Sequence, residues 1–248
     1  MSNLAPTPAP SRVAAALVHT YTASGSVLAF FMIVAAVKGE AKTALWLFFV
    51  AMVIDGTDGL LARHFKVKIS MPEFDGALLD NIVDYLTYVF APVVLMWAGG
   101  HLPSGQVGWI VASLPLLAST YQFCRADAKT EDHFFLGFPS YWNVVAFYVI
   151  VLELGQTTTA WLITILAILV FVPVKYVYPS RTADLWYLNM GLATVWLCLY
   201  LVIVMQWPNP TPALLWLSLS YVAFYTAESL ALTYRHHRSA QPNSAQPS

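Results

Sequence analysis

Four aspartates in the first third of the chain form two pairs whose spacing could assemble a metal site. Asp55 and Asp58 are three residues apart, and Asp80 and Asp84 are four residues apart. Either spacing places the two side chains on one face of an α-helix. If the two helices are antiparallel neighbours, the four carboxylates converge, and they repel one another unless cations lie between them. Carboxylate oxygens suit hard divalent ions, so the pattern predicts Mg²⁺ or Mn²⁺.

Helix capping is the alternative role for an aspartate in this region. An acidic side chain is favourable near a helix N-terminus, which suits Asp75, shortly before the second pair. Asp55 lies near the C-terminal end of its expected helix, where the helix dipole disfavours an anion. We therefore interpret Asp75 as a cap and the four paired aspartates as a site.

Small residues and one arginine lie among the aspartates. Gly56 and Gly59 bracket Asp58, Gly76 precedes the second pair, and Arg63 follows at the same helix end. Glycine lets a backbone or a large ligand approach closely, and a guanidinium group can pair with phosphate oxygens. The combination predicts a phosphate-bearing ligand beside the metal site.

The composition places these residues in a membrane protein. Charged residues make up 10% of the 248 residues and hydrophobic residues 58%, whereas a soluble domain carries about 25% charged residues. So few charges could not cover the surface of a soluble domain. The net charge of −1 also leaves no basic patch for a nucleic acid. We predict an all-α polytopic membrane protein that binds no nucleic acid.

The chain contains eight apolar segments that could cross a bilayer, whose core takes about 20 residues of helix. The expected spans are 21–37, 44–61, 77–98, 107–123, 141–154, 158–174, 188–207 and 213–234. The fifth is short for a complete span. Residues 12–20 are expected to form a helix along the interface or a direct extension of the first span.

The basic residues predict the orientation. With a cytoplasmic N-terminus, only Lys38 and Lys42 of the twelve basic residues fall outside, which agrees with the positive-inside rule. Eight spans then place both termini and the aspartates on the cytoplasmic side. Residues 1–11 and the Pro-, Ser- and Gln-rich residues 236–248 are expected to be disordered, and 12–235 form a single membrane domain.

The segment from Asp55 to Asp84 resembles a specific family motif. It reads D-G-T-D-G-L-L-A-R, then twelve residues, then G-A-L-L-D-N-I-V-D, and it is similar to the motif of the CDP-alcohol phosphotransferases. The twelve-residue gap, which contains F-K-V-K-I-S-M-P-E-F, is longer than in most members and resembles the bacterial phosphatidylcholine synthase branch. The stretches V-H-T-Y-T-A-S-G, A-K-T-E-D-H-F-F-L-G-F-P-S-Y-W-N and V-K-Y-V-Y-P-S-R extend the resemblance along most of the chain. The usual family core has six membrane helices, and eight fits this branch.

The resemblance implies a reaction and a setting for it. The phosphatidyl group of CDP-diacylglycerol would pass to choline with release of CMP, assisted by two divalent ions. The enzyme would lie in a bacterial inner membrane with its active site facing the cytoplasm, and family analogy suggests a homodimer.

The resemblance also implies roles for single residues. Asp55, Asp58 and Asp80 match metal ligands, and Asp84 matches the general base and a further metal ligand. Small motif positions against which the CDP moiety would lie are matched by Gly59, Ala62 and Gly76.

Basic residues beyond the motif could bind the lipid phosphate. Lys129, Arg125 and Arg181 are the candidates, and the alternative for each is a charge that only determines topology. Together with Gly56 and Arg63, we expect Lys129 to contact CDP-diacylglycerol.

Choline carries a permanent cation that cannot donate a hydrogen bond from nitrogen, so its recognition should use aromatic faces. The candidates near the cytoplasmic side are Tyr85, Tyr88, Tyr141, Trp142, Tyr178 and Tyr187. Aromatic belts at membrane interfaces are the alternative for each of them. Tyr141 and Trp142 gain support from the F-P-S-Y-W-N similarity. Tyr187 is the third expected choline contact and ranks after these two.

Two other functions are compatible with parts of the pattern. A cation or proton transporter could also cluster intramembrane acids, but the glycine spacing, the arginine and the position at one membrane face favour a site open to a soluble nucleotide. An acceptor alcohol other than choline is the second alternative. Serine would call for groups that bind its carboxylate, and inositol phosphate for an extra basic pocket. Glu153 and Glu228 lie in late spans and receive no role.

Overall fold

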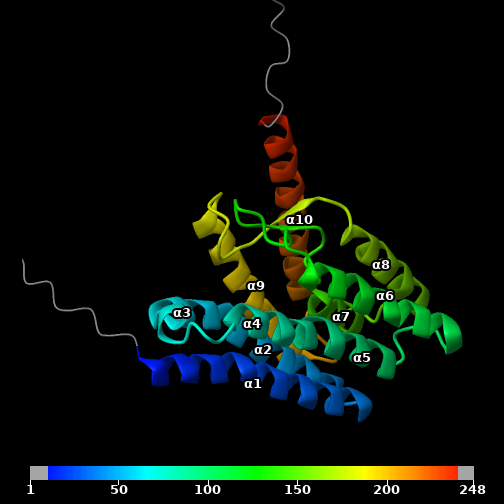
Figure 1. Cartoon of the computed structure of the whole chain (residues 1–248). Coiled ribbons are helices and arrows are strands. Elements are labelled where there is room, and N and C mark those ends of the chain that lie inside the picture. The colour runs from blue at the N-terminus through cyan, green and yellow to red at the C-terminus, as the bar shows by residue number, and fades with distance from the viewer. Residues whose placement is uncertain (1–10, 240–248) are drawn as a thin grey trace, which may run out of the picture.

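A computed structural model describes residues 11–239, and Figure 1 shows helices packed side by side with the last helix standing across the first. The elements are α1 (Arg12–Val37), α2 (Ala41–His64), α3 (Val67–Ser70), α4 (Gly76–Asp84), the π-helix η1 (Tyr85–Phe90), α5 (Ala91–Ala98), α6 (Gly105–Cys124), β1 (Phe134–Leu136), α7 (Trp142–Val151), α8 (Gln156–Leu169), β2 (Lys175–Val177), α9 (Trp186–Gln206) and α10 (Pro212–Ser239). The fold is therefore helical apart from one small ribbon.

Five segments are long and apolar enough to cross a membrane, among the residues that the structure describes. They are 12–37, 41–64, 76–98, 105–124 and 186–206. The prediction of a helical membrane protein is confirmed, and all eight predicted spans contain helices, but the structure does not support eight full spans. Helix α7 has 10 residues and α8 has 14, or about 15 and 21 Å of helix, against a bilayer core of about 30 Å.

The first and last helices extend beyond the first and last predicted spans. Helix α1 begins at Arg12 as a direct extension of the first span, and the Ser11 hydroxyl caps it by accepting from the Ala14 amide at 3.3 Å. Helix α10 continues to Ser239, four residues into the tail predicted at 236–248. The predictions of disorder for 1–10 and 240–248 fall outside the described residues.

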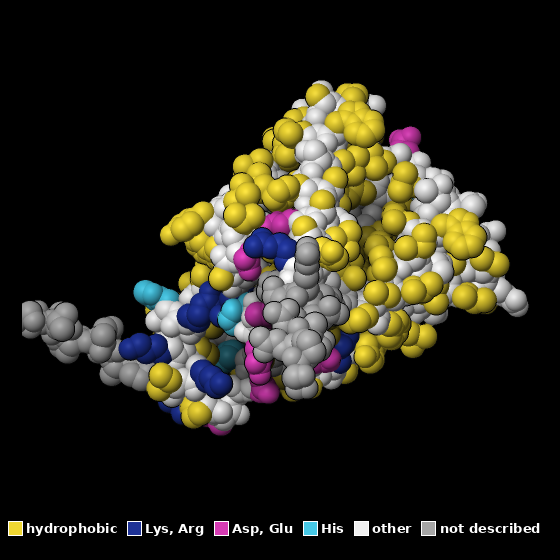
Figure 2. All heavy atoms as spheres, turned by 90° about the horizontal axis from the view of Figure 1, so that it is seen from above, with side chains coloured by type: hydrophobic (Ala, Val, Ile, Leu, Met, Phe, Trp, Pro, Cys, Tyr) yellow, Lys and Arg dark blue, Asp and Glu magenta, His cyan; other side chains and the backbone are white. Residues whose placement is uncertain are grey.

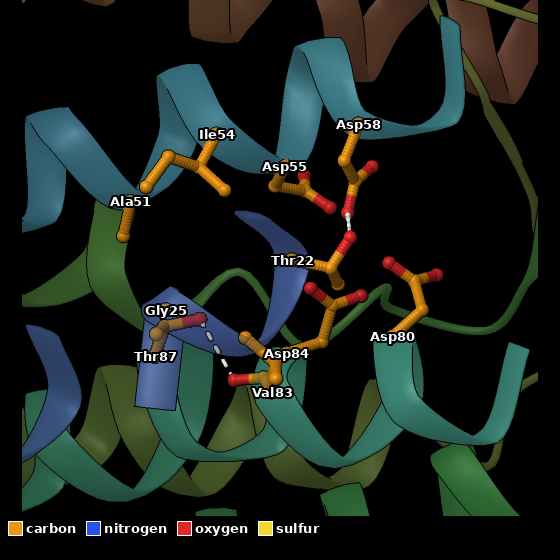
Figure 3. Close-up of a pocket in the computed structure, with 10 residues that line it drawn as sticks. All are labelled: Thr22, Gly25, Ala51, Ile54, Asp55, Asp58, Asp80, Val83, Asp84 and Thr87. Atoms are coloured by element: carbon orange, nitrogen blue, oxygen red, sulfur yellow. Dashed lines mark hydrogen bonds between the residues drawn. The ribbon is translucent and has the colours of Figure 1, made fainter. Parts of the chain in front are cut away.

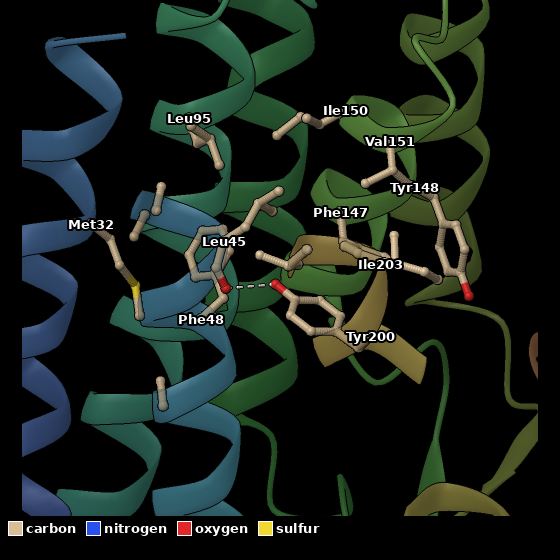
Figure 4. Packing of buried hydrophobic residues seen from close by; sticks show 14 of the residues in the cluster. Met32, Leu45, Phe48, Leu95, Phe147, Tyr148, Ile150, Val151, Tyr200 and Ile203 are labelled. Carbon is tan, nitrogen blue, oxygen red and sulfur yellow. Dashed lines mark hydrogen bonds between the residues drawn. The ribbon is translucent and has the colours of Figure 1, made fainter. Parts of the chain in front are cut away.

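The core lies between the long helices, and side chains from α1, α2, α5, α7 and α9 meet there. Figure 4 shows Met32, Phe48 and Phe147 packed together. The Tyr200 hydroxyl donates to the Leu45 carbonyl at 2.8 Å, so a buried polar group is satisfied. Large apolar side chains are also exposed on the outer faces, for example Phe30, Trp109 and Trp161. Helices that are apolar on both sides suit a bilayer.

Charged side chains are not spread evenly over the surface. On the face seen in Figure 2, Lys, Arg, Asp and Glu gather in one region, and hydrophobic side chains cover much of the rest. Lys42, one of the two lysines predicted on the opposite side, donates to the carbonyls of Met205 at 3.1 Å and Trp207 at 3.0 Å. The Lys42 ammonium group therefore caps the C-terminal end of α9.

Helix α1 lies close to α4 because glycine leaves room between them. A Cβ atom on Gly25 would lie 2.5 Å from Cγ1 of Val83, and one on Gly76 would lie 2.8 Å from the ring of His19. A real Cβ atom does not approach another heavy atom so closely, so a larger residue at either position would force its neighbour to move. This close approach brings α1 beside the helix that carries Asp80 and Asp84.

We therefore predict that Gly25→Ala destabilises the protein by about 1–3 kcal/mol, because overpacking must displace the stiff β-branched Val83. Thermal unfolding of the purified protein in detergent measures the effect. Gly191→Ala in α9 is the matched control, since its Cβ would meet nothing within 4 Å. Equal unfolding temperatures for the two variants would contradict the prediction.

Candidate active site

The four paired aspartates converge on one pocket. Asp55 and Asp58 come from α2, Asp80 and Asp84 from α4, and Figure 3 shows all four carboxylates pointing into the space between these helices. Oxygen atoms of Asp55, Asp80 and Asp84 lie within 4.8 Å of one another. Asp58 lines the same pocket without belonging to this closest group. The antiparallel pairing of α2 and α4 thus brings together side chains that are up to 29 positions apart.

Two hydroxyl groups hold the aspartates of α2 in place. Thr22 on α1 donates to Asp58 Oδ2 at 2.8 Å, and Tyr88 on η1 donates to Asp55 Oδ2 at 2.7 Å. Asp58 is only 7% exposed, so its hydrogen bond to Thr22 is the kind that keeps a buried carboxylate in one orientation. Sequence reasoning missed Thr22, although the V-H-T-Y-T-A-S-G similarity contained it.

Asp75 lies outside this pocket and caps α4. Its carboxylate accepts from the amides of Ala77 and Leu78, both at 3.0 Å. The interpretation of Asp75 as a cap is confirmed. The π-helix η1, which the prediction of one continuous span did not include, begins immediately after Asp84, and π-bulges are frequent at functional sites.

The pocket is strongly negative, and among the described residues one lysine carries a charge that acts on all four carboxylates. Lys129, in the loop after α6, interacts electrostatically with Asp55, Asp58, Asp80 and Asp84. One ammonium group cannot balance four carboxylates. Apolar atoms of Ala51, Ile54 and Val83 line the other side of the pocket and strengthen the repulsion. A cluster of carboxylate oxygens in this setting fits a hard divalent cation.

The glycines and the arginine of α2 leave a ligand-accessible strip beside the pocket. A Cβ on Gly56 would meet nothing within 4 Å, and one on Gly59 would lie 3.4 Å from Nη1 of Arg63. The exposed guanidinium group therefore folds back over Gly59. These three predicted ligand contacts remain open to a phosphate-bearing molecule.

Gly76 and Ala62 serve helix packing in the structure. Gly76 faces the His19 ring, and Ala62 packs against the buried cluster of Ala15, Val18 and Val67. Both predicted contacts therefore set how closely α1 approaches α2 and α4.

Of the three expected choline contacts, the structure brings only Tyr141 to the site. Its ring centroid lies 6.2 Å from that of Tyr88, whose hydroxyl contacts Asp55. Trp142 is 0% exposed, and its Nε1 donates to Ser119 Oγ at 2.8 Å, so it belongs to the core. Tyr187 is 86% exposed and packs edge-on against Trp186. Trp142 shares an apolar cluster with Tyr88 and Tyr141, but neither Trp142 nor Tyr187 is among the described residues that line the aspartate pocket.

The other aromatic and basic candidates are also placed by the structure. The Tyr85 hydroxyl donates to the Leu116 carbonyl at 3.2 Å. The Tyr178 ring stacks on Phe135 at 4.4 Å, with Lys129 Nζ 6.0 Å from its centroid. Arg125 pairs with Asp127, and Arg181 is exposed. Tyr178 and Lys129 therefore lie together, and the charge of Lys129 acts on the aspartate pocket.

A two-stranded ribbon, which the all-α prediction did not foresee, positions this aromatic group. Strands β1 and β2 pair antiparallel, and the Lys175 ammonium lies 2.5 Å from Asp132. Partial burial alone would raise the pKa of Asp132, but bonding to Lys175 and Thr130 outweighs it and lowers that pKa to about 2. The Asp132 carboxylate is thus charged at neutral pH. Three-residue strands carry no periodicity that sequence reasoning could detect.

Comparison with known proteins links this geometry to one enzyme family. Residues 14–173 match the profile of the CDP-alcohol phosphatidyltransferase family. The chain is 43% identical to the phosphatidylcholine synthase of Legionella bozemanae, over 82% of this chain and 97% of that protein. It is 40% identical to the phosphatidylcholine synthase of Legionella pneumophila, over 89% of each chain. It is 38% identical to that of Borreliella burgdorferi, over 88% of this chain and 94% of that protein.

Proposed function

The chain belongs to the CDP-alcohol phosphatidyltransferase family, and from this premise we propose that it transfers the phosphatidyl group of CDP-diacylglycerol to choline and releases CMP. The observation that carries the proposal is the convergence of two pairs of aspartates on one pocket, in a chain whose relatives are phosphatidylcholine synthases. The apolar helices make it a multi-pass membrane enzyme.

We assign the aspartate cluster to divalent cations, Mg²⁺ or Mn²⁺, in two sites. Asp55, Asp80 and Asp84 would supply the closest group of oxygens, and Asp58 a further one. Bound there, the cations would neutralise the diphosphate of the substrate and stabilise the phosphate that leaves with CMP. Thr22 and Tyr88 hold two of the carboxylates in fixed orientations, which is the role expected of residues that support metal ligands.

Asp84 is our candidate for the general base. It takes the proton of the choline hydroxyl while the hydroxyl oxygen attacks the lipid-linked phosphorus in line. A new phosphorus–oxygen bond forms as the bond to the CMP phosphate breaks. The proton can leave late in this transition state, so a carboxylate suffices as the base.

The lipid nucleotide would lie along α2. Support comes from the open strip at Gly56 and Gly59, from the Arg63 guanidinium above it, and from Lys129, whose charge acts on the aspartate pocket. Guanidinium and ammonium groups both pair with phosphate oxygens. Ala62 and Gly76 would contribute by letting the helices approach. We further propose a bacterial inner-membrane location with the site facing the cytoplasm, and, by family analogy, a homodimer.

Tyr141 is our candidate for a ring that contacts the trimethylammonium group, since it lies between Tyr88 and Phe135 at 6.2 Å from each ring. Replacing Tyr141 by leucine is expected to raise the choline KM by about threefold to thirtyfold, the value of one cation–π contact. The KM for CDP-diacylglycerol should change little. Choline titration at saturating lipid substrate measures both, with Tyr187→Leu as the exposed control. An unchanged choline KM in Tyr141→Leu would remove this residue from the choline site.

The proposed function is tested by an acceptor panel. Purified protein in detergent micelles receives labelled CDP-diacylglycerol with choline, serine or inositol phosphate, with and without Mg²⁺ or Mn²⁺. We expect labelled phosphatidylcholine only, and only with metal. Robust transfer to serine or inositol phosphate and none to choline would overturn the acceptor assignment.

A further inference from the structure

Helix α10 carries a carboxylate that the proposed chemistry does not use. Oε1 of Glu228 accepts a hydrogen bond from Asn189 Nδ2 at 3.1 Å. Its Oε2 is buried and has no hydrogen-bond partner among the residues that the structure describes. A buried carboxylate oxygen without a partner is costly. An ionisable group kept inside a membrane protein at such a cost is a functional hypothesis by default.

Two tyrosines share the helix face of Glu228. Tyr225 and Tyr221 precede it by three and seven residues, spacings that place all three side chains on one side of α10. Their rings lie 6.4 Å apart. The Tyr225 hydroxyl donates to the Val177 carbonyl at 2.9 Å, so β2 holds this ring in place. The face therefore combines π surfaces with a free carboxylate oxygen.

This face continues toward the aspartate cluster through Tyr141. The ring of Tyr141 lies 6.5 Å from that of Tyr225 and 6.2 Å from that of Tyr88. Tyr141 interacts electrostatically with both Asp55 and Tyr221, and Tyr221 interacts with Glu228. A row of rings thus connects the reacting end of the site with the carboxylate on α10.

The chemistry of this row selects one kind of ligand. A trimethylammonium group offers positive charge and methyl surface but no hydrogen-bond donor, and it suits tyrosine faces together with an anionic oxygen that lacks a donor. The carboxylate of serine and the phosphate of inositol phosphate would both be repelled by Glu228. We propose that Glu228, with Tyr221 and Tyr225, forms the subsite for the quaternary ammonium group of the acceptor alcohol. This inference rests on the proposed function.

The test compares choline with its neutral carbon isostere, 3,3-dimethyl-1-butanol, in wild type and Glu228→Gln. Loss of the charge should raise the choline KM by about thirtyfold, whereas the inhibition constant of the isostere stays within about twofold. A merely structural role would weaken both ligands alike. Glu153→Gln, the same change at the end of α7, is the matched control and should alter neither value.

The outcomes separate the inference from the function on which it rests. If wild type uses choline and Glu228→Gln weakens both ligands equally or neither, the subsite is wrong and the phosphatidyl transfer to choline stands. If wild type does not use choline, both fail. If Glu228→Gln does not fold, the pair of variants Tyr221→Leu and Tyr221→Phe provides an independent test. Only the leucine variant should raise the choline KM, by about threefold to thirtyfold, and equal values for both variants would overturn the inference.

Discussion

Replacing Asp84 by asparagine is expected to lower turnover by about 10²- to 10⁴-fold, the usual contribution of a general base. Asparagine keeps the shape of the side chain but cannot accept the proton of the choline hydroxyl. Asp84 lies in the pocket beside Asp55 and Asp80, so the substitution would also remove one oxygen of the proposed metal site. The variant should still bind CDP-diacylglycerol, because Asp55, Asp58, Asp80 and the strip along α2 remain.

Single-turnover assays at saturating choline and metal, with equilibrium binding of labelled CDP-diacylglycerol, measure the two effects separately. Asp75→Asn is the matched control. It makes the same chemical change nine residues earlier, at a cap position where asparagine and aspartate are about equally good. Its turnover should equal that of wild type. Near-normal turnover in Asp84→Asn would make the general-base assignment wrong.

Removing divalent metal is expected to abolish activity completely. The pocket holds four carboxylates, and within the described part of the chain the Lys129 ammonium is the positive charge that acts on all of them. Without added positive charge, the diphosphate of the substrate would be repelled. Activity should vanish in EDTA and return when Mg²⁺ or Mn²⁺ is added in excess.

A direct measurement of Mn²⁺ binding to the protein without substrate separates the metal site from catalysis. Asp80→Asn should weaken Mn²⁺ binding by at least about tenfold, since it removes one charged ligand from the closest group. Asp132→Asn, whose carboxylate pairs with Lys175 outside the pocket, is the control and should bind Mn²⁺ as wild type does. Full activity in chelator would contradict the metal assignment.

The aspartate cluster could be predicted from the sequence because its geometry is largely local. Spacings of three and four fix the face of a helix, and a short connection makes the helices of Asp58 and Asp80 antiparallel neighbours. The residues that support the cluster depend on tertiary packing. Thr22 reaches Asp58 of α2 from α1, and Gly25 lets α1 approach Val83 of α4 closely; no local pattern expresses either contact.

The choline site was harder to predict for the same reason. Tyr141 and Trp142 are adjacent in the sequence, so similarity supports them equally, yet successive helical residues point in different directions. Tyr141 faces Tyr88, and Trp142 faces the core and Ser119. Glu228 was identified as an intramembrane acid, but its partners lie on α9 and on its own helix, and only the folded chain shows them.

The structure supports five of the eight predicted spans by length and composition, because hydropathy does not report where a helix ends. Hydropathy predicts one span over the apolar segment 141–154. Helix α7 stops at Val151, and Glu153 adopts a left-handed conformation with φ of 51°. Such a residue ends a helix in the way that a C-cap does. Leu152 and Glu153 form a turn, and Leu154 lies in the connection to α8.

The attachment of α10 to the ribbon has a consequence for the order in which the protein is made. The amides of Lys175 and Val177 donate to the hydroxyls of Thr233 and Ser229, so the last helix docks on a strand synthesised more than fifty residues earlier. Chains emerge from the ribosome N-terminus first. The residues that line the aspartate pocket, from Thr22 to Thr87, are therefore all synthesised before α10. Docking of α10 on β2 is therefore a late step of folding, which waits until the whole membrane domain has been synthesised.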